Sequence, residues 1–343
     1  DGLATGEIAL YLKIHHAALD GVSGMALAAA LFDETSEPAQ VPADWRERIG
    51  EAENPGIGQR LGAALRQTAS QCVSAARALP AGLQLLAGLF KADTKDKSAG
   101  MRQNLVFGPK TPLNVPITGE RGFSAVSLSL AGVKEIARRQ DATLNDIVLT
   151  ICSGALRRYL QEHGGLPRNS LIATMPVSLR AAGDTDTSIL ATLTLVKLAT
   201  NLADPLRRLH AVRAAAGAAK SLTRHARSVI PTDFPSLGAP WILSALASLY
   251  GRSGLTKVIP PLANVAISNV PGPRRPLFLA GARVRACWPL SIVTHGLGLN
   301  ITVFSYGDSL DFGLTVARAA LPDVHSLAQA LTFAYGELQQ LSL

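Results

Sequence analysis

The chain has 343 residues, of which 48% are hydrophobic and 17% charged, and its formal net charge is +8 at pH 7. This length exceeds one ordinary core and predicts two domains or one large bilobal domain. The basic excess suits an anionic surface or a phosphate-bearing ligand, but basic residues are not interleaved with aromatics, which argues against nucleic acid. We find no secretory signal and no apolar run long enough to span a bilayer.

The three cysteines are scattered, and we expect Cys152 to be a buried, reduced thiol, which favours a cytoplasmic location.

The first part of the chain predicts a buried strand over residues 8–14 (IALYLKI), because the run is short and almost wholly apolar. A strand so early needs neighbours, so we expect an amino-terminal segment to be missing from this chain. Helices are predicted over 25–32, 57–79 and 83–90. Residues 91–120 are rich in charge, then in proline, and predict an interdomain crossover.

The remainder predicts a second domain in which strands and helices interleave irregularly. We expect strands at 124–130, 171–175, 190–198, 265–268, 284–287, 299–305 and 310–316, and helices at 133–139, 143–161, 204–225, 234–250 and 324–341. This order predicts an α/β fold of mixed sheets with covering helices. The helix at 234–250 is apolar nearly all round, which indicates deep burial or contact with a membrane.

Two adjacent histidines follow the first predicted strand, in the run His15-His16-Ala17-Ala18-Leu19-Asp20-Gly21. A neutral imidazole is well suited to remove a proton near pH 7. Successive strand residues point to opposite faces, so one histidine faces a reacting centre and the other packs behind it. The alternatives are a core histidine or a metal site, and the metal site lacks HExxH spacing and a third ligand cluster. Asp20 either orients a histidine or holds the turn, and Gly21 permits a positive φ.

Two further motifs have both structural and chemical interpretations. Thr143 and Asp146 have the spacing of a capping box, for which Asn145 is not needed. Asn145 would lie at a helix N-terminus, where positive potential and a side-chain donor suit a developing oxyanion. The segment Asn269-Val270-Pro271-Gly272-Pro273 predicts a rigid turn after a strand. Without a Gly-x-Ser-x-Gly motif, covalent catalysis is not indicated.

These motifs together carry a family resemblance. HHAALDG at 15–21 resembles the HHxxxDG motif of CoA-dependent acyltransferases. LNDIVL, MPVSLR, SNVPGP and LNITVFSYGDSLDFGL, at 144–149, 175–180, 268–273 and 299–314, resemble the bacterial wax ester synthase/diacylglycerol acyltransferase family. The resemblance implies a two-domain chloramphenicol-acetyltransferase-like fold. Residues 1–90 would be the remainder of the N-terminal domain, 91–120 the crossover linker and 121–343 the C-terminal domain, with the active site between the domains.

The resemblance also implies a reaction. A fatty acyl group passes from acyl-CoA to diacylglycerol or a fatty alcohol, with His16 as general base and with support from His15 and Asp20. Asn145 and Asp146 match the family's ND motif, and no cofactor, metal or nucleic acid is implied. The expected location is cytoplasmic, with peripheral contact at the inner membrane face or lipid droplets. The alternatives are a related acyltransferase with another acceptor, or a catalytically silent lipid-binding protein that uses helix 234–250 and the basic helix near Arg207–Arg227.

Overall fold

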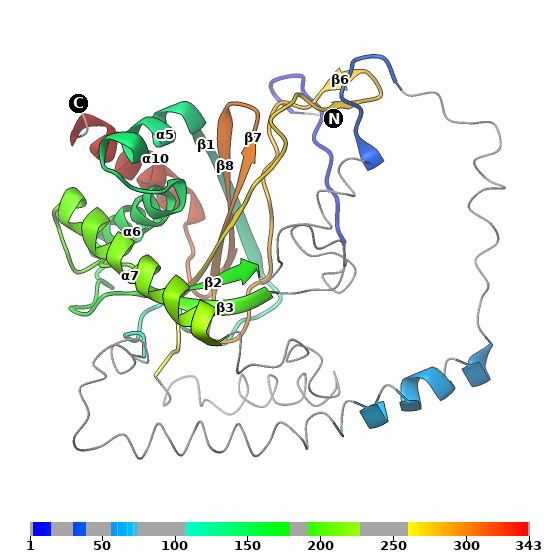
Figure 1. The fold of residues 1–343 in the computed structure, drawn as a ribbon, viewed down its shortest axis with the longest axis horizontal. Helices are drawn as coiled ribbons and strands as arrows, with labels where there is room; N and C mark the ends of the chain where they lie inside the picture. The colour runs from blue at the N-terminus through cyan, green and yellow to red at the C-terminus, as the bar shows by residue number, and fades with distance from the viewer. Residues whose placement is uncertain are drawn as a thin grey trace.

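The structure is a computed structural model (Figure 1). It describes residues 3–14, 30–38, 56–59, 61–66, 68–70, 73, 107–178, 191–226 and 260–341. Its elements are β1 (Arg121–Ser129), α5 (Leu130–Arg139), α6 (Leu144–Glu162), β2 (Ile172–Ser178), β3 (Ala191–Lys197), α7 (Pro205–Ala226), β4 (Val265–Val270), β5 (Phe278–Leu279), β6 (Ala282–Arg283), β7 (Leu299–Tyr306), β8 (Ser309–Ala317) and α10 (Val324–Leu341). Residues 57–59, 61–66, 68–70 and 73 are helical, as predicted, while the helix predicted at 234–250 lies outside the described residues.

One mixed sheet of six strands, in the order β1-β8-β7-β4-β2-β3, organises the described part of the chain. The pairs β2–β4 and β4–β7 are parallel, and the others are antiparallel. Alternate residues of its central strands are apolar and fully buried, which places them on one face. In register, Ile301 lies opposite Leu314 and Val303 opposite Phe312.

The four helices α5, α6, α7 and α10 all cover this apolar face (Figure 1). Helix α6 is the centre of the layer, because it packs against α5, α7 and α10. Its buried residues lie on nearly every side, so only its ends and a narrow stripe meet solvent. Cys152, midway along α6, is a free and buried thiol, as predicted.

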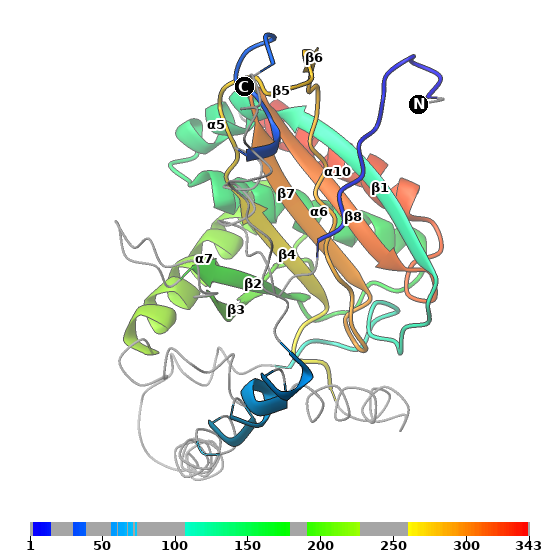
Figure 2. The same ribbon diagram turned by 90° about the vertical axis from the view of Figure 1, so that its right-hand side faces the viewer.

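The opposite face of the sheet carries the polar residues Asn300, Thr302, Asp311 and Thr315. Residues 284–293, here called the crossing segment, run across this face (Figure 2). Cys287 N donates to Asp311 Oδ2 at 2.8 Å, and Ser291 N donates to Thr315 Oγ1 at 3.4 Å. The indole of Trp288 donates to Ser127 Oγ at 3.0 Å. Side chains of β1 and β8 therefore hold this segment, so the strand predicted at 284–287 is wrong.

Residues 107–120, the end of the predicted linker, are fixed to the sheet by two asparagines. Asn264, fully buried before β4, donates to Pro109 O at 2.6 Å and to Asn114 Oδ1 at 2.8 Å. Its own Oδ1 accepts from Ile172 N at 2.9 Å. Asn114 Nδ2 in turn donates to Ala263 O and to Gly296 O, at 3.0 and 2.8 Å. This network satisfies backbone groups that would otherwise be buried unpaired.

The buried strand predicted at residues 8–14 is also wrong. These residues form no strand, and their apolar side chains are exposed, with Ile8 at 79%. An apolar run becomes a buried strand only where another backbone pairs with it, and none of the described residues does so. In the part of the chain that the structure describes, no helix is both long and apolar enough to cross a bilayer.

Candidate active site

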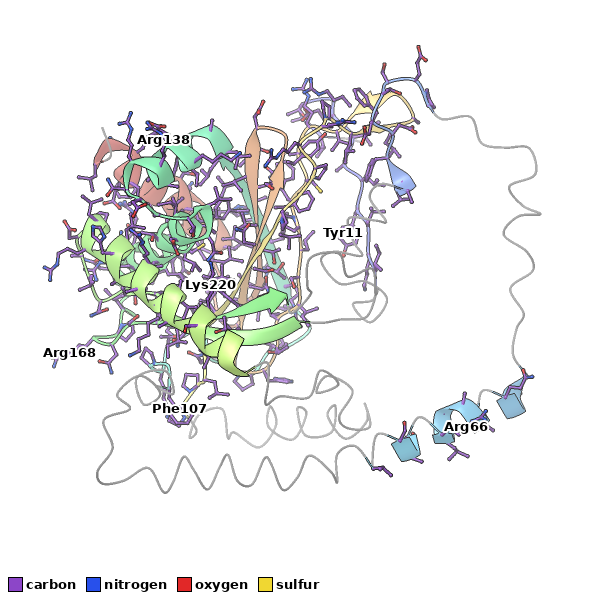
Figure 3. All side chains as sticks on the ribbon, in the orientation of Figure 1. Tyr11, Arg66, Phe107, Arg138, Arg168 and Lys220 are labelled. Carbon is purple, nitrogen blue, oxygen red and sulfur yellow. The ribbon has the colours of Figure 1, made fainter. Side chains whose placement is uncertain are left out.

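The histidine motif, with His15, His16, Asp20 and Gly21, lies outside the described residues, but the segments on both sides of it are described. Tyr11, four residues before His15, lies on the side of the sheet opposite the helices (Figure 3). Both flanking segments contact residues 275–285, which carry β5 and β6 and lead into the crossing segment. Glu7 pairs with Arg285 at 3.3 Å, and Glu34 pairs with Arg275 at 2.7 Å.

A backbone pair strengthens the second of these contacts. Asp33 N donates to Phe278 O at 2.9 Å, and Phe278 N donates to Asp33 O at 2.8 Å. The two ion pairs are exposed and add little stability, so the backbone pair defines the position better. The described segments before and after the motif are therefore both attached to residues 275–285.

Asn145 lies in the first turn of α6, as the sequence predicted. Its amide nitrogen Nδ2 is buried and has no hydrogen-bond partner in the described residues. A buried donor without a partner is costly, of order 1–3 kcal/mol, so such a group needs an explanation. The position also has the positive potential of a helix N-terminus. These properties suit a donor that awaits an anionic oxygen.

Asp146 has the structural role that the spacing predicted. Its Oδ2 accepts from Thr143 N at 2.9 Å and from Thr143 Oγ1 at 2.7 Å, while Asp146 N donates to Thr143 Oγ1 at 3.2 Å. The capping box is complete, and Asp146 is only 5% exposed. None of these contacts involves the side-chain amide of Asn145. The capping box therefore fixes the position of Asn145 and leaves its amide N–H groups available for another hydrogen bond.

The predicted turn begins later than expected, because Asn269 and Val270 are the last residues of β4 and only Pro271 and Gly272 follow its carboxyl end. A Cβ on Gly272 would lie 2.1 Å from Ser305 O, and Gly272 N donates to Ser305 Oγ at 3.0 Å. Only glycine therefore fits against β7 here. No hydrogen bond joins this turn to Asn145 within the described residues, so the two motifs are separate structural features.

Sequence reasoning missed the crossing segment and the polar face beneath it. Asp311 is fully buried, and its Oδ1 has no partner in the described part of the chain. A Cβ on Gly313 would lie 1.8 Å from Pro289 O, which shows how closely the segment approaches β8. The alternate residues Trp288, Leu290 and Ile292 are exposed apolar side chains. The available signal was the polar and glycine positions in an otherwise apolar strand at 309–317.

Burial raises the pKa of the Cys152 thiol to about 12, which keeps it protonated and unreactive. The buried Cys152 thiol is therefore a core side chain and not an activated nucleophile.

Comparison with known proteins supplies the family. The sequence model described as "Wax ester synthase/diacylglycerol acyltransferase catalytic domain" matches residues 1–148, and that described as "WS/DGAT C-terminal domain" matches residues 191–339. A putative diacylglycerol O-acyltransferase of Mycobacterium tuberculosis is 36% identical in an alignment 343 positions long, which covers 99% of this chain and 72% of that protein. O-acyltransferase WSD of Acinetobacter baylyi is 36% identical over 339 residues, covering 95% of this chain and 69% of that protein.

A solved structure agrees. The wax ester synthase/diacylglycerol acyltransferase from Marinobacter aquaeolei VT8 superposes with a TM-score of 0.61 at 27% identity, covering 96% of this chain. This chain spans 66% of that protein's length. The superposition confirms the α/β, chloramphenicol-acetyltransferase-like fold class predicted from the sequence. The chain belongs to the wax ester synthase/diacylglycerol acyltransferase family of O-acyltransferase enzymes.

Proposed function

We propose that this protein transfers a long-chain fatty acyl group from acyl-CoA to the hydroxyl of diacylglycerol or a fatty alcohol, with His16 as general base. The observation that carries the proposal is the catalytic-domain match over residues 1–148, which includes the HHxxxDG run at 15–21, together with the C-terminal match over residues 191–339. The names of the relatives, a diacylglycerol O-acyltransferase and a wax ester synthase, support these two acceptors. In this proposal residues 1–90 and 121–343 form the two domains that enclose the site, joined by 91–120.

The proposed step is a direct attack. A neutral His16 ring nitrogen removes the proton from the acceptor hydroxyl as its oxygen bonds to the thioester carbonyl carbon, and the carbonyl oxygen becomes an oxyanion. The carbon–sulfur bond then breaks, and the CoA sulfur leaves with the proton held by the imidazolium. General-base catalysis of this kind contributes a factor of ~10²–10⁴. The proposal gives His15 and Asp20 supporting roles, with Gly21 in the turn.

Asn145 is the proposed donor to the oxyanion. Its Nδ2 is buried and unpartnered among the described residues, at the N-terminus of a helix that the capping box fixes. A donor that is fixed before the reaction needs no reorganisation when charge develops on the oxygen. The crossing segment, which displays Trp288, Leu290 and Ile292, offers apolar surface suited to an acyl chain. Peripheral contact with the inner membrane face or lipid droplets would bring these apolar substrates to a cytoplasmic enzyme.

The test is acceptor-dependent release of CoA from palmitoyl-CoA. We expect release only when hexadecanol or diacylglycerol is added, and a loss of ~10²-fold or more in His16→Ala, because the alcohol then keeps its proton. His210→Ala, a change to an exposed histidine on α7, is the matched control and should keep full activity. Full transfer by His16→Ala would contradict the general base. Vesicle binding without any CoA release would indicate the silent lipid-binding alternative.

A further inference from the structure

An arginine-lined groove lies on the helical layer, away from the polar face of the sheet. It has a volume of about 500 Å³ and is formed by α6, the start of α7 and α10. Three guanidinium groups line it, from Arg157, Arg158 and Arg208, together with the carboxylates of Glu162 and Glu337. Arg158 already pairs with Glu162 at 2.9 Å and lies 3.9 Å from the ring centre of Phe333. The other two arginines have no carboxylate partner among the described residues.

Arg208 is only 2% exposed. Its Nη1 donates to Leu202 O and Ala203 O, at 3.0 and 3.1 Å, but its Nε is buried and has no partner in the described residues. Gly154 makes room for it, because a Cβ there would lie 3.0 Å from Arg208 Nη2. Burying a guanidinium without a carboxylate in ion-pair contact is costly, and hydrogen bonds from Nη1 to two carbonyls leave the Nε unexplained.

Arg157 adds a second positive charge close by. Its Nη1 donates to Thr200 O at 2.8 Å, and its remaining N–H groups have no partner in the described part of the chain. Burial lowers the pKa of Arg208. The carboxylates of Glu337 and Asp204 oppose that shift, while Arg157 adds to it by like-charge repulsion. An anion between the two guanidinium groups would relieve both the burial cost and the repulsion.

We propose that this groove binds a phosphate group through Arg157 and Arg208, a site separate from the acyl-transfer chemistry. The fork of N–H donors on each guanidinium matches the oxygens of phosphate, and two such forks suit a dianion better than a single carboxylate. The phosphate could belong to a lipid headgroup, which would place the exposed ring of Phe333 at a membrane surface, or to a free phosphate compound. The proposal does not rest on the function of His16.

The first measurement is calorimetric titration of the whole protein with inorganic phosphate at constant ionic strength, with chloride as the reference anion. We expect saturable binding that weakens about tenfold in Arg157→Gln, because a charge-assisted hydrogen bond is lost. Arg157→Lys keeps the positive charge but not the fork of N–H donors, so its affinity for phosphate should lie between those of the unchanged protein and Arg157→Gln. Arg138→Gln, on α5 outside the groove, is the matched control and should bind as the unchanged protein does.

A second variant keeps the test independent of any folding defect. Glu337→Gln removes a carboxylate that repels the bound anion, so we expect phosphate to bind several-fold more tightly. Vesicles of phosphatidylcholine, with and without phosphatidic acid, then identify the source. Arg157-dependent retention on the phosphatidic acid vesicles assigns a lipid headgroup, and phosphate binding without retention assigns a free compound. Unsaturable phosphate binding, or binding that neither variant changes, overturns the proposal.

Discussion

At the scale of the residue, Asn145 is the sharpest test of the site. Asn145→Asp replaces the amide donor with a carboxylate of nearly the same shape, and Asn145→Ala removes it. Because the buried Nδ2 has no partner among the described residues, neither change breaks a structural bond. We expect kcat for acyl transfer to fall ~10²–10³-fold in both, with little change in the KM for acyl-CoA. The measurement is steady-state kinetics with palmitoyl-CoA, alongside circular dichroism.

The control for Asn145 is Asn201→Ala, which changes an exposed asparagine outside the motifs and should keep full activity. A kcat that stays within twofold of the unchanged protein in Asn145→Ala would exclude the oxyanion role. The amide would then be an unpaired buried donor without a catalytic function.

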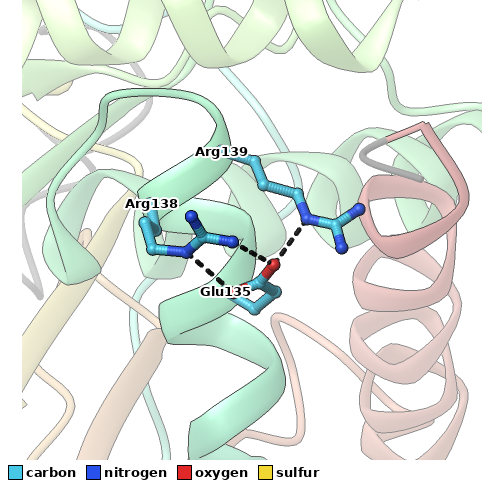
Figure 4. A network of polar contacts seen from close by, with 3 residues as sticks. All are labelled: Glu135, Arg138 and Arg139. Carbon is cyan, nitrogen blue, oxygen red and sulfur yellow. Dashed lines mark hydrogen bonds and ion pairs between the residues drawn. The ribbon is translucent and has the colours of Figure 1, made fainter.

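A second prediction at this scale concerns the pH dependence of the Glu135 carboxylate. On α5, Arg138 and Arg139 donate to its carboxylate (Figure 4), at 2.7 and 2.6 Å for the shortest contacts. Hydrogen bonds from Arg138 and then Arg139 lower the pKa of Glu135 from 4.5 to about 2. Folding lowers this pKa, so the pairs stabilise the protein above pH 4.5 and lose that effect as the pH falls towards 2.

The measurement is an NMR titration of the Glu135 side-chain carboxyl. We expect it to titrate near pH 2 in the unchanged protein and closer to 4.5 in Arg138→Gln. The whole cluster is exposed, so Glu135→Gln should change the stability at neutral pH very little. An unshifted titration in the native protein would show that the two pairs do not persist in solution.

At the scale of the element, two glycines should respond oppositely to the same change. On β8, a Cβ at Gly313 would lie 1.8 Å from Pro289 O, so Gly313→Ala must displace the crossing segment. On α7, a Cβ at Gly217 meets nothing within 4 Å. We expect Gly217→Ala to stabilise the protein by ~0.5–1 kcal/mol, and Gly313→Ala to destabilise it by several times more, about 2–4 kcal/mol. Urea unfolding measures both changes in the free energy of unfolding. If Gly313→Ala changed it no more than Gly217→Ala does, the crossing segment would not lie against β8.

Sequence patterns predicted the helices and strands whose ends and buried faces are marked within their own residues. Helix α6 was expected at 143–161 and lies at Leu144–Glu162, because the capping box marks its start and apolar spacing gives its length. The strands β7 and β8 were found in the same way, within one residue at each end. Each combines an apolar face with clear boundaries.

The errors occurred where backbone pairing is decided by distant residues. Residues 8–14 are as apolar as a buried strand, yet no described backbone pairs with them. The crossing segment also has strand-like composition, but its N–H groups bond to Asp311 and Thr315 side chains. In the candidate site, the roles of Thr143 and Asp146 followed from spacing alone. The unsatisfied Nδ2 of Asn145 did not, since it depends on the three-dimensional packing around α6.

At the scale of the whole molecule, the family matches and the sheet divide the chain differently. The catalytic-domain match ends at residue 148, within α6, and the C-terminal match begins at 191. Strand β1, within the first match, pairs with β8, within the second, over its full length from Arg121 to Ser129. Residues 107–120 are fixed to the start of β4 by Asn114 and Asn264. In the described residues, one sheet therefore joins strands that belong to both family matches.

Two fragments of the chain test whether the structural unit follows the sheet or the C-terminal family match. A fragment of residues 107–343 keeps every strand of the six-stranded sheet and all four helices of its layer. One of residues 191–343 lacks β1, β2, α5 and α6, and this loss exposes Phe312, Leu314 and their buried neighbours. Because that apolar surface then meets water, we expect only the longer fragment to unfold cooperatively in urea and to stay monomeric. Cooperative unfolding of the 191–343 fragment would instead show that the structural boundary coincides with the family match.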